Sequence, residues 1–233
     1  MRAVFQDRHD AGRRLATALA DDAGLAGGQR LVVLAIPRGG LPVGAEVARA
    51  LDAEFDVVVV RKLRTPQNPE LGFGAVGSDG HVEIDQRLVR RLRLTQEQIR
   101  AEIEDRRQLI ERRLELYRSV TPAVDLAGAL IIVVDDGIAT GGTAREACAL
   151  ARRMGAARVV LAVPVAPWRT AAEFASTADR VLVLNEPAEF FAVGQAYKDF
   201  GQLDDASSLE VLRELAAHTR GGPGGQPRRS IGR

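Results

Sequence analysis

The amino-acid sequence predicts an α/β protein whose open, mostly parallel five-stranded sheet is covered by helices on both faces and carries an inserted flap. Short β-branched apolar runs alternate along the chain with segments whose apolar residues recur about every three to four positions. Such alternation indicates a parallel sheet, because a helix usually makes the crossover between parallel strands. The alternation stops between residues 61 and 127, and this interruption predicts the flap.

Five apolar runs are the expected strands, and each has a length typical of a strand that is buried on both faces. They cover residues 31–36, 56–60, 129–134, 158–165 and 180–184. Five amphipathic segments are the expected helices, at residues 9–20, 41–50, 143–154, 168–176 and 207–217. We expect Trp168 to pack at the start of the fourth helix, and Cys148 to lie in the core.

The interruption begins with a basic stretch and a proline-containing loop, and two short runs around a Ser-Asp-Gly turn then predict a hairpin. A long polar helix follows, and Thr95 and Gln98 have the spacing of a capping box at its start. Because the insertion is too small to fold alone, we expect residues 1–218 to form one domain with residues 61–127 as its flap. The basic tail, residues 219–233, is rich in Gly and Pro and is expected to be disordered.

The composition argues against several classes of protein. The chain has 32 Lys and Arg against 31 Asp and Glu, and this near-neutral balance does not support nucleic-acid binding by the whole chain. The single cysteine, Cys148, excludes an intramolecular disulfide and a multi-cysteine zinc site. The sequence has neither a signal-peptide pattern nor an apolar run of about 18 residues, so we expect a cytoplasmic protein without a membrane span.

The strongest functional signal lies between residues 130 and 147, where an apolar strand leads into two acids, a loop of small residues and a helix. The N-terminus of a helix presents N–H groups and a partial positive charge, which together bind phosphate. Gly141 and Gly142 allow an anion to approach the backbone closely, and the hydroxyls of Thr140 and Thr143 add donors. This loop is therefore a candidate phosphate site.

Asp135 and Asp136 stand between the strand and this loop. Two carboxylates can accept hydrogen bonds from a vicinal diol such as the 2′- and 3′-hydroxyls of ribose. A phosphate site beside a diol site describes a binding site for ribose 5-phosphate. The alternative is a polar strand end with two solvated acids, and the strand before and the helix after favour the functional interpretation.

The segment resembles the 5-phosphoribosyl-1-diphosphate (PRPP) signature of type I phosphoribosyltransferases, which consists of apolar residues, two acids, a short variable stretch and Thr-Gly-Gly-Thr. Residues 7–215 also resemble a bacterial group of uncharacterised phosphoribosyltransferase-domain proteins that share Pro-Arg-Gly-Gly, Pro-Gln-Asn-Pro-Glu and a distal Ala-Val-Gly segment. The resemblance implies Mg²⁺ as the cofactor, held by Asp135 and Asp136 directly or through water. It also implies that the ribose and the 5-phosphate of PRPP are bound by Asp135, Asp136, Ala139, Thr140, Gly141, Gly142 and Thr143.

A second loop follows the first expected strand and opens a helix, so it should lie at the same edge of the sheet as the acids. It contains Arg38, Gly39 and Gly40. The resemblance implies that this is the pyrophosphate loop, whose amides and basic side chain hold the diphosphate, often through a non-proline cis peptide. An ordinary strand–helix turn with a solvent-facing arginine is the alternative.

Arg61, Lys62 and Arg64 follow the second expected strand. The resemblance implies that a loop at this place closes over the diphosphate as a basic lid, which excludes water and neutralises the leaving group. A solvated basic turn is the alternative. The candidate catalytic residues are Asp135, Asp136, Arg38 and Lys62.

Two further patterns need an interpretation. Residues 72–77 match Gly-x-Gly-x-x-Gly, but a dinucleotide fingerprint needs an apolar strand before it and a helix after it, so we expect a hairpin here. Aromatic residues cluster between residues 185 and 205, after the last expected strand. They could stack on an acceptor base or belong to the core, and their position does not separate the two.

These observations and the resemblance predict an enzyme that transfers the 5-phosphoribosyl group from PRPP to a small-molecule acceptor, a nitrogenous base, and releases pyrophosphate. Ala139 stands where the resemblance implies an acidic residue in 6-oxopurine enzymes, so the acceptor stays open. The main alternative is a non-catalytic regulatory module that senses PRPP or a nucleotide, and a phosphatase or nucleotide hydrolase is a weaker third. No membrane or nucleic-acid partner is expected, and a homodimer is an open possibility.

Overall fold

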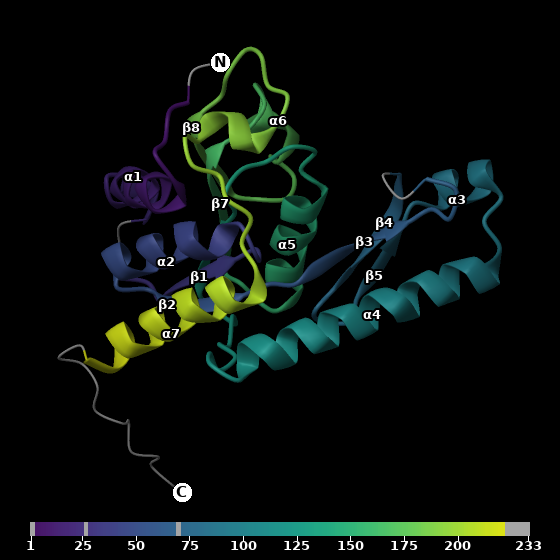
Figure 1. Ribbon diagram of the computed structural model, residues 1–233, viewed down its shortest axis with the longest axis horizontal. Helices are drawn as coiled ribbons and strands as arrows, with labels where there is room; N and C mark the ends of the chain where they lie inside the picture. Colours follow the sequence, from purple (N-terminus) through teal and green to yellow (C-terminus); the bar gives the residue numbers. More distant parts are fainter. Residues whose placement is uncertain (1–2, 26–27, 69–70, 222–233) are drawn as a thin grey trace, which may run out of the picture.

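A five-stranded parallel sheet lies at the centre of the molecule (Figure 1). The structure, a computed structural model, describes residues 3–25, 28–68 and 71–221. The strand order β2-β1-β6-β7-β8 places the first strand beside the strand that precedes the two acids. The strands are β1 (Leu31–Ala35), β2 (Glu54–Val57), β6 (Leu130–Val134), β7 (Arg158–Val165) and β8 (Arg180–Asn185). The predicted α/β fold is confirmed.

Helices cover both faces of this sheet (Figure 1). One face carries α1 and α2, with α7 packed against α2, and the other face carries α5 and α6. These helices are α1 (Arg8–Ala20), α2 (Gly40–Leu51), α5 (Gly142–Arg153), α6 (Thr170–Glu173) and α7 (Asp205–Gly221). Two 3₁₀ turns, η1 (Ala23–Leu25) and η2 (Val193–Ala196), precede β1 and follow β8.

Alternate residues of each strand enter two hydrophobic cores, because successive side chains of a strand point to opposite faces. Val33 and Ala35 of β1 pack in the core beneath α1 and α2, whereas Val32 and Leu34 pack in the core beneath α5. Cys148 is fully buried in the second core, as expected. Burial raises the pKa of its thiol to about 12, so the group stays neutral and unreactive at physiological pH.

The flap extends sideways from the central sheet and rests against α5 (Figure 1). It consists of three antiparallel strands and two helices: β3 (Val60–Arg64), β4 (Gly72–Gly77), β5 (Val82–Ile84), α3 (Gln86–Leu92) and α4 (Gln96–Arg118). The predicted hairpin is formed by β4 and β5, so the Gly-x-Gly-x-x-Gly match is a strand and not a dinucleotide loop. The capping box is also confirmed: Oγ1 of Thr95 accepts from the amide of Gln98 at 3.2 Å, and Oε1 of Gln98 accepts from the amide of Thr95 at 2.9 Å.

The expected strand at residues 56–60 is wrong in its extent. The structure divides it between the end of β2 and the start of β3, and β3 pairs with β4 in the flap. Arg61, Lys62 and Arg64 therefore lie in a strand and not in a loop. The run of four valines at residues 57–60 favours extended structure throughout. No Gly or Pro marks the point where the chain leaves the central sheet and enters the flap, so the sequence pattern does not show the break.

The expected helix at residues 168–176 is reduced to the four residues of α6. Arg169 has a φ of 70°, in the left-handed region, so the helix begins only after it. Trp168 consequently lies outside the helix, and its side chain is 63% exposed instead of packed.

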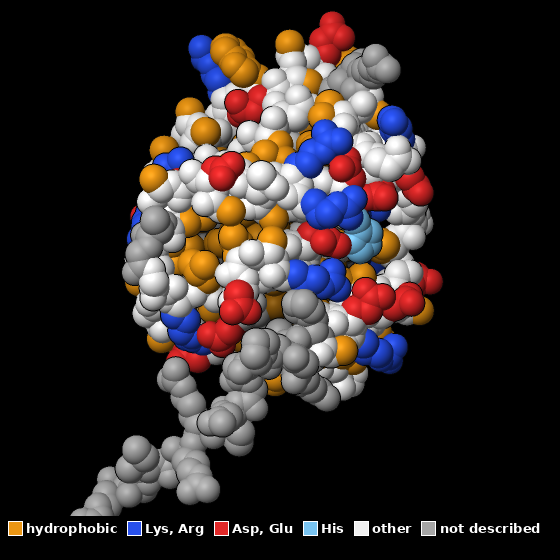
Figure 2. Space-filling view, turned by 90° about the vertical axis from the view of Figure 1, so that its left-hand side faces the viewer, with side chains coloured by type: hydrophobic (Ala, Val, Ile, Leu, Met, Phe, Trp, Pro, Cys, Tyr) orange, Lys and Arg blue, Asp and Glu red, His pale blue; other side chains and the backbone are white. Residues whose placement is uncertain are grey.

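The C-terminal helix is longer than expected. α7 continues to Gly221 and so includes the first three residues of the expected disordered tail, and the remainder, residues 222–233, lies outside the described residues. On the face formed by α1, α2 and α7, side chains of both charges are interspersed (Figure 2). Glu46, for example, bonds to His9 at 2.9 Å and to Arg49 at 3.3 Å. Among the helices that the structure describes, none has the length and apolar character needed to cross a membrane.

Candidate active site

Two loops meet at the carboxyl end of the central sheet. β1 and β6 are parallel neighbours with Ala35 opposite Val134, so the loops that follow them begin at the same level. A methyl group on Gly40 would lie 2.6 Å from the carbonyl oxygen of Val134, and a methyl group on Gly39 would overlap the carboxylate of Asp136. The backbone of the candidate pyrophosphate loop therefore touches the second acid at a position where only glycine leaves room.

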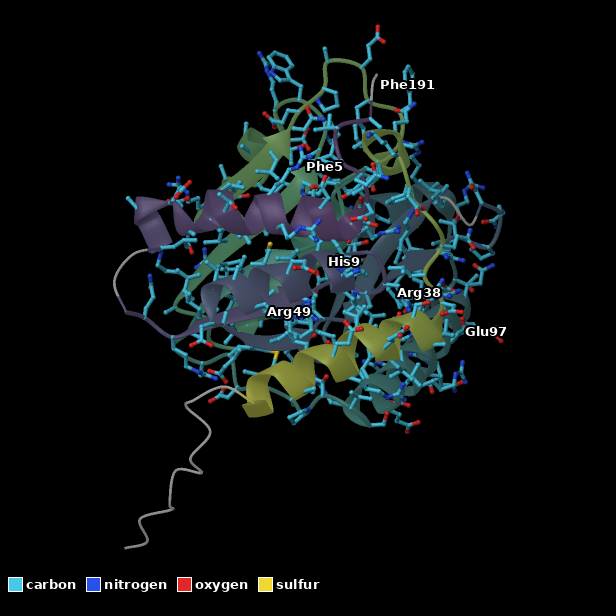
Figure 3. All side chains as sticks on the ribbon, turned by 60° about the vertical axis from the view of Figure 1, so that its left-hand side comes forward. Phe5, His9, Arg38, Arg49, Glu97 and Phe191 are labelled. Carbon is cyan, nitrogen blue, oxygen red and sulfur yellow. The ribbon has the colours of Figure 1, made fainter. Side chains whose placement is uncertain are left out.

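The first loop contains a cis peptide bond between Pro37 and Arg38, which agrees with the resemblance to pyrophosphate loops. The side chain of Arg38 is partly exposed, and its Nη1 lies 3.6 Å from Oδ1 of Asp205, the first residue of α7. Figure 3 shows Arg38 beside this end of α7. The carboxylate of Asp205 thus orients the guanidinium of Arg38, which remains accessible to an anion.

The loop between β6 and α5 leaves several of its small residues open to solvent. Thr140, Gly142 and Thr143 are exposed, and a methyl group on Gly142 would meet no atom within 4 Å. Gly141 is the N-cap of α5 and has a φ of 74°, in the left-handed region that favours glycine. The N-terminus of a twelve-residue helix therefore faces open space beside two hydroxyls, which suits the binding of a phosphate.

Asp135 and Asp136 (the acid pair) are partly buried, and the amide of Asp136 donates to Oδ1 of Asp135 at 2.9 Å. Burial raises the pKa of both carboxyls. At Asp135 the negative charge of Asp136 raises the pKa further, to well above its ordinary range, whereas at Asp136 the guanidinium of Arg8 opposes the rise. A site in this state favours ligands that bring positive charge or hydrogen-bond donors.

The acid pair fits Mg²⁺ as a ligand set. Mg²⁺ commonly binds one or two carboxylates and completes its coordination with water and substrate oxygens. Within residues 3–25, 28–68 and 71–221, no group of three or more His, Cys, Asp and Glu side chains forms a cage for a metal ion. The two carboxylates are of the kind that Mg²⁺ takes together with oxygens of a phosphorylated substrate.

Arg8, in the first turn of α1, is a site residue that the sequence patterns did not reveal. Its Nε donates to Oδ2 of Asp136 at 2.8 Å, and the two side chains are only 11% and 13% exposed. Its Nη1 donates to the carbonyl oxygen of Gly201 at 2.9 Å, and its guanidinium lies 3.8 Å from the ring centre of Phe200. Because 128 residues separate Arg8 from Asp136, no local motif could indicate this contact.

The segment after β8 holds the same acid through its backbone. The hydroxyl of Tyr197 donates to the carbonyl oxygen of Asp136 at 2.6 Å. The ring of Tyr197 packs against Phe5 and Phe200, with centroid distances of 5.4 and 4.9 Å. Phe191, in contrast, is 80% exposed and projects from the loop after β8 (Figure 3). Tyr197 and Phe200 thus belong to the packing around the acid pair, and Phe191 does not.

The flap faces the phosphate loop across a cavity of about 570 Å³. Lys62 of β3 lines this cavity together with Thr140, Gly142 and Thr143 of the loop. The structure therefore brings one of the three basic flap residues opposite the candidate phosphate site.

The other two basic flap residues lie elsewhere. Arg61 lies near α4, where burial and the neighbouring charges of Arg113, Arg106 and Arg38 lower the pKa of its guanidinium. The backbone amide of Arg64 donates to Glu102 of α4 at 2.9 Å, after a shift in register between Leu63 and Arg64. Arg64 and Lys62 line different pockets, so the three side chains do not form one basic surface in this structure.

Comparisons with known proteins agree with this architecture. Residues 5–199 match the model of the phosphoribosyl transferase domain family. The chain is 50% identical over 211 residues to a Mycobacterium tuberculosis protein named "Putative phosphoribosyl transferase Rv0571c", with 90% of this chain and 46% of that protein covered. The chain thus spans about half the length of the curated relatives it matches.

A solved structure is similar over nearly the whole chain. The crystal structure of the protein TT1426 from Thermus thermophilus is 40% identical, and the match covers 92% of this chain and 99% of that one with a TM-score of 0.77. A match of this extent spans both the central sheet and the flap. The chain therefore belongs to the phosphoribosyl transferase domain family.

Proposed function

We propose that this chain transfers the 5-phosphoribosyl group of PRPP to a nitrogenous base and releases pyrophosphate. The observation that most supports this proposal is the contact between Gly39 and the carboxylate of Asp136, beside the open N-terminus of α5. It brings to one edge of the sheet a loop suited to a diphosphate, a pair of acids suited to a diol, and a helix end suited to a phosphate. PRPP carries all three groups on one ribose ring.

In this proposal each part of PRPP is bound by a different set of residues. The 5-phosphate accepts hydrogen bonds from the amides and hydroxyls of residues 140–143. The ribose hydroxyls donate to the acid pair, and the diphosphate accepts from the amide of Gly39 and from Arg38. The amide of Gly40 donates instead to the carbonyl oxygen of Ile36 at 3.0 Å and so shapes the loop. The acid pair would hold Mg²⁺ directly or through water, and the ion would supply positive charge that neutralises the leaving group.

Breaking the bond between C1 of the ribose and the diphosphate oxygen separates charge. Positive charge develops on the ribose, where the carboxylates of the acid pair stabilise it, and negative charge develops on the diphosphate, where Arg38 and Lys62 stabilise it. A nitrogen of the acceptor then forms the new bond at C1 with inversion, and its proton passes to solvent water. Closure of the flap across the cavity would bring Lys62 to the bound ligand and exclude water.

We propose an aromatic heterocycle as the acceptor, and Phe191 offers an exposed ring in the loop that follows β8 as a candidate surface for stacking. A ring that is 80% exposed is available to stack on a planar base. Ala139 supplies no carboxyl group to a purine, which weakens the case for hypoxanthine or guanine as the acceptor.

The direct test is pyrophosphate release from PRPP and Mg²⁺ in the presence of a panel of purine, pyrimidine and related bases. We expect release with at least one base, and loss of release in the variant Asp135→Asn/Asp136→Asn, which keeps side-chain size and removes both charges. Tight PRPP binding without turnover would support the sensor instead, and phosphate release from nucleotides without PRPP would support a hydrolase. Calorimetry that detects no PRPP binding with Mg²⁺ would contradict both the transferase and the sensor.

A further inference from the structure

The N-terminal segment forms a fixed part of the candidate active site. The amides of Val4 and Phe5 both donate to the carbonyl oxygen of Ala196 at 2.9 Å, and the amide of Lys198 donates to the carbonyl oxygen of Phe5 at 2.9 Å. These bonds join the segment before α1 to the segment after β8. As a result Arg8, at the start of α1, is held between Phe200 and the acid pair.

The guanidinium of Arg8 is fixed on three sides. Asp136 accepts from its Nε, Gly201 accepts from its Nη1, and Phe200 lies under its face. A side chain with three contacts loses most of its rotamer freedom, so the carboxylate bonded to it is held in one orientation as well. Tyr197 fixes the backbone of the same residue through its carbonyl oxygen.

The oxygen that Arg8 holds is the one that faces the pyrophosphate loop. Oδ2 of Asp136 accepts from Arg8, and the same oxygen is the atom nearest to the position of a methyl group on Gly39. A different rotation of this carboxylate would change its fit against the loop and the direction of its free lone pairs. The contact with Arg8 therefore determines how Asp136 meets both the loop and a ligand.

We propose that Arg8 is a positioning residue for the transfer, which orients the carboxylate of Asp136 toward the ribose hydroxyls of PRPP. The inference rests on the proposed function of the acid pair. Two other roles make different predictions. A purely structural Arg8 would change the stability of the chain without changing its affinity for PRPP, and an Arg8 that competes with the ribose for Asp136 would weaken binding in the wild type.

The test is calorimetry with PRPP and Mg²⁺ on the full chain. We expect Arg8→Gln to bind PRPP roughly 10- to 100-fold more weakly, which is the range for a lost charge-assisted hydrogen bond. Arg8→Lys should recover part of the affinity, because an ammonium reaches the carboxylate without the second anchor at Gly201. Arg13→Gln is the matched control on the same helix: it removes the charge of an exposed arginine and should leave the affinity unchanged.

A double-mutant cycle distinguishes a loss of Asp136 positioning from a general loss of folded structure. Arg8→Gln should have little further effect when Asp136 is already Asn, and its full effect when Thr143 is already Ala. Unchanged or tighter binding by Arg8→Gln, or additive effects with Asp136→Asn, would overturn the inference. If Arg8→Gln does not fold, Arg8→Lys decides: affinity equal to that of the wild type overturns the inference. A wild-type chain that does not bind PRPP is a separate result, because it refutes the proposed function before any substitution is made.

Discussion

Gly39→Ala tests the contact between the pyrophosphate loop and the acid pair. Gly39 has a φ of −59° and a ψ of −39°, a conformation that alanine adopts readily, so the backbone alone predicts no loss. The added methyl group, however, would overlap Cγ and Oδ2 of Asp136 and lie 2.8 Å from Oδ1. Only a shift of the loop or of the carboxylate relieves the overlap, and Arg8 holds the carboxylate at 2.8 Å.

The expected size of the effect follows from this overlap. Forcing a methyl group into a well-packed site costs about 1–3 kcal/mol. For a chain of this length, each kcal/mol lowers the melting temperature by about 2–4 °C. We therefore expect ligand-free Gly39→Ala to melt roughly 2–12 °C below the wild type. Its affinity for PRPP should also fall, by about tenfold or more, since displacement of Asp136 disturbs the diol site as well.

Gly142→Ala is the matched control for stability. A methyl group there meets no atom within 4 Å, and the residue lies in the first turn of α5, where alanine in place of glycine stabilises by about 0.4–1 kcal/mol. Both variants are compared by thermal and urea unfolding without ligand and then by calorimetry with PRPP and Mg²⁺. Equal melting temperatures for Gly39→Ala and the wild type, or equal losses in the two variants, would refute the assigned contact.

Other expectations concern charge, stacking and the flap. Folding raises the pKa of the acid pair above the ordinary value of 3.8, so the folded chain keeps protons that the unfolded chain releases, and stability falls as the pH rises from about 4 toward neutrality. Replacing Asp135 by Asn should then raise the free energy of unfolding in EDTA at pH 7 but not near pH 4, and urea titrations that show an equal change at both pH values would contradict the assignment. Phe191→Ala should leave the melting temperature unchanged, because the ring is 80% exposed, and should raise KM for the acceptor base without raising KM for PRPP; unchanged values for both substrates would argue against stacking. Arg118→Met should lower the free energy of unfolding by roughly 2–4 kcal/mol. It removes the positive charge that Arg118, at the end of α4, provides to Asp56, which is 4% exposed and keeps hydrogen bonds from the amides of Val57 and Val124. Urea unfolding beside the exposed control Arg112→Met checks this, and equal stability of the two variants would show that the ion pair contributes little.

The parts of the site that lie in one continuous segment could be predicted from the sequence. Residues 140–143 come between a strand and the first turn of a helix, and this order along the chain is visible in the sequence. The meeting of the two loops could also be predicted, because parallel strands place their carboxyl ends at one edge. The capping box at Thr95 is local in the same sense, and it begins α4 as expected.

Contacts between distant segments could not be predicted in this way. Arg8 looks like one more charged residue in a polar segment, and only the pairing of Phe5 with Tyr197 brings it to Asp136. The direction of Lys62 depends on the pairing of β3 with β4, because strand residues alternate between faces and a shift of one residue would exchange Lys62 with Arg61. Both features are set by tertiary structure, which no single stretch of sequence encodes.

The acid pair links the stability of the free chain to its affinity for a ligand. Two carboxyls with raised pKa values in a partly buried position oppose folding at neutral pH, so the chain would be more stable with an amide in their place. The ion pair with Arg8 offsets part of this cost at Asp136, but less of it at Asp135, where the pKa stays well above its ordinary range. A ligand that brings a cation and two hydroxyl donors would stabilise the charged carboxylates and so offset the rest of this cost in stability. Substitutions that stabilise the free chain at the acid pair should therefore weaken PRPP binding, whereas stabilising substitutions elsewhere in the chain should not.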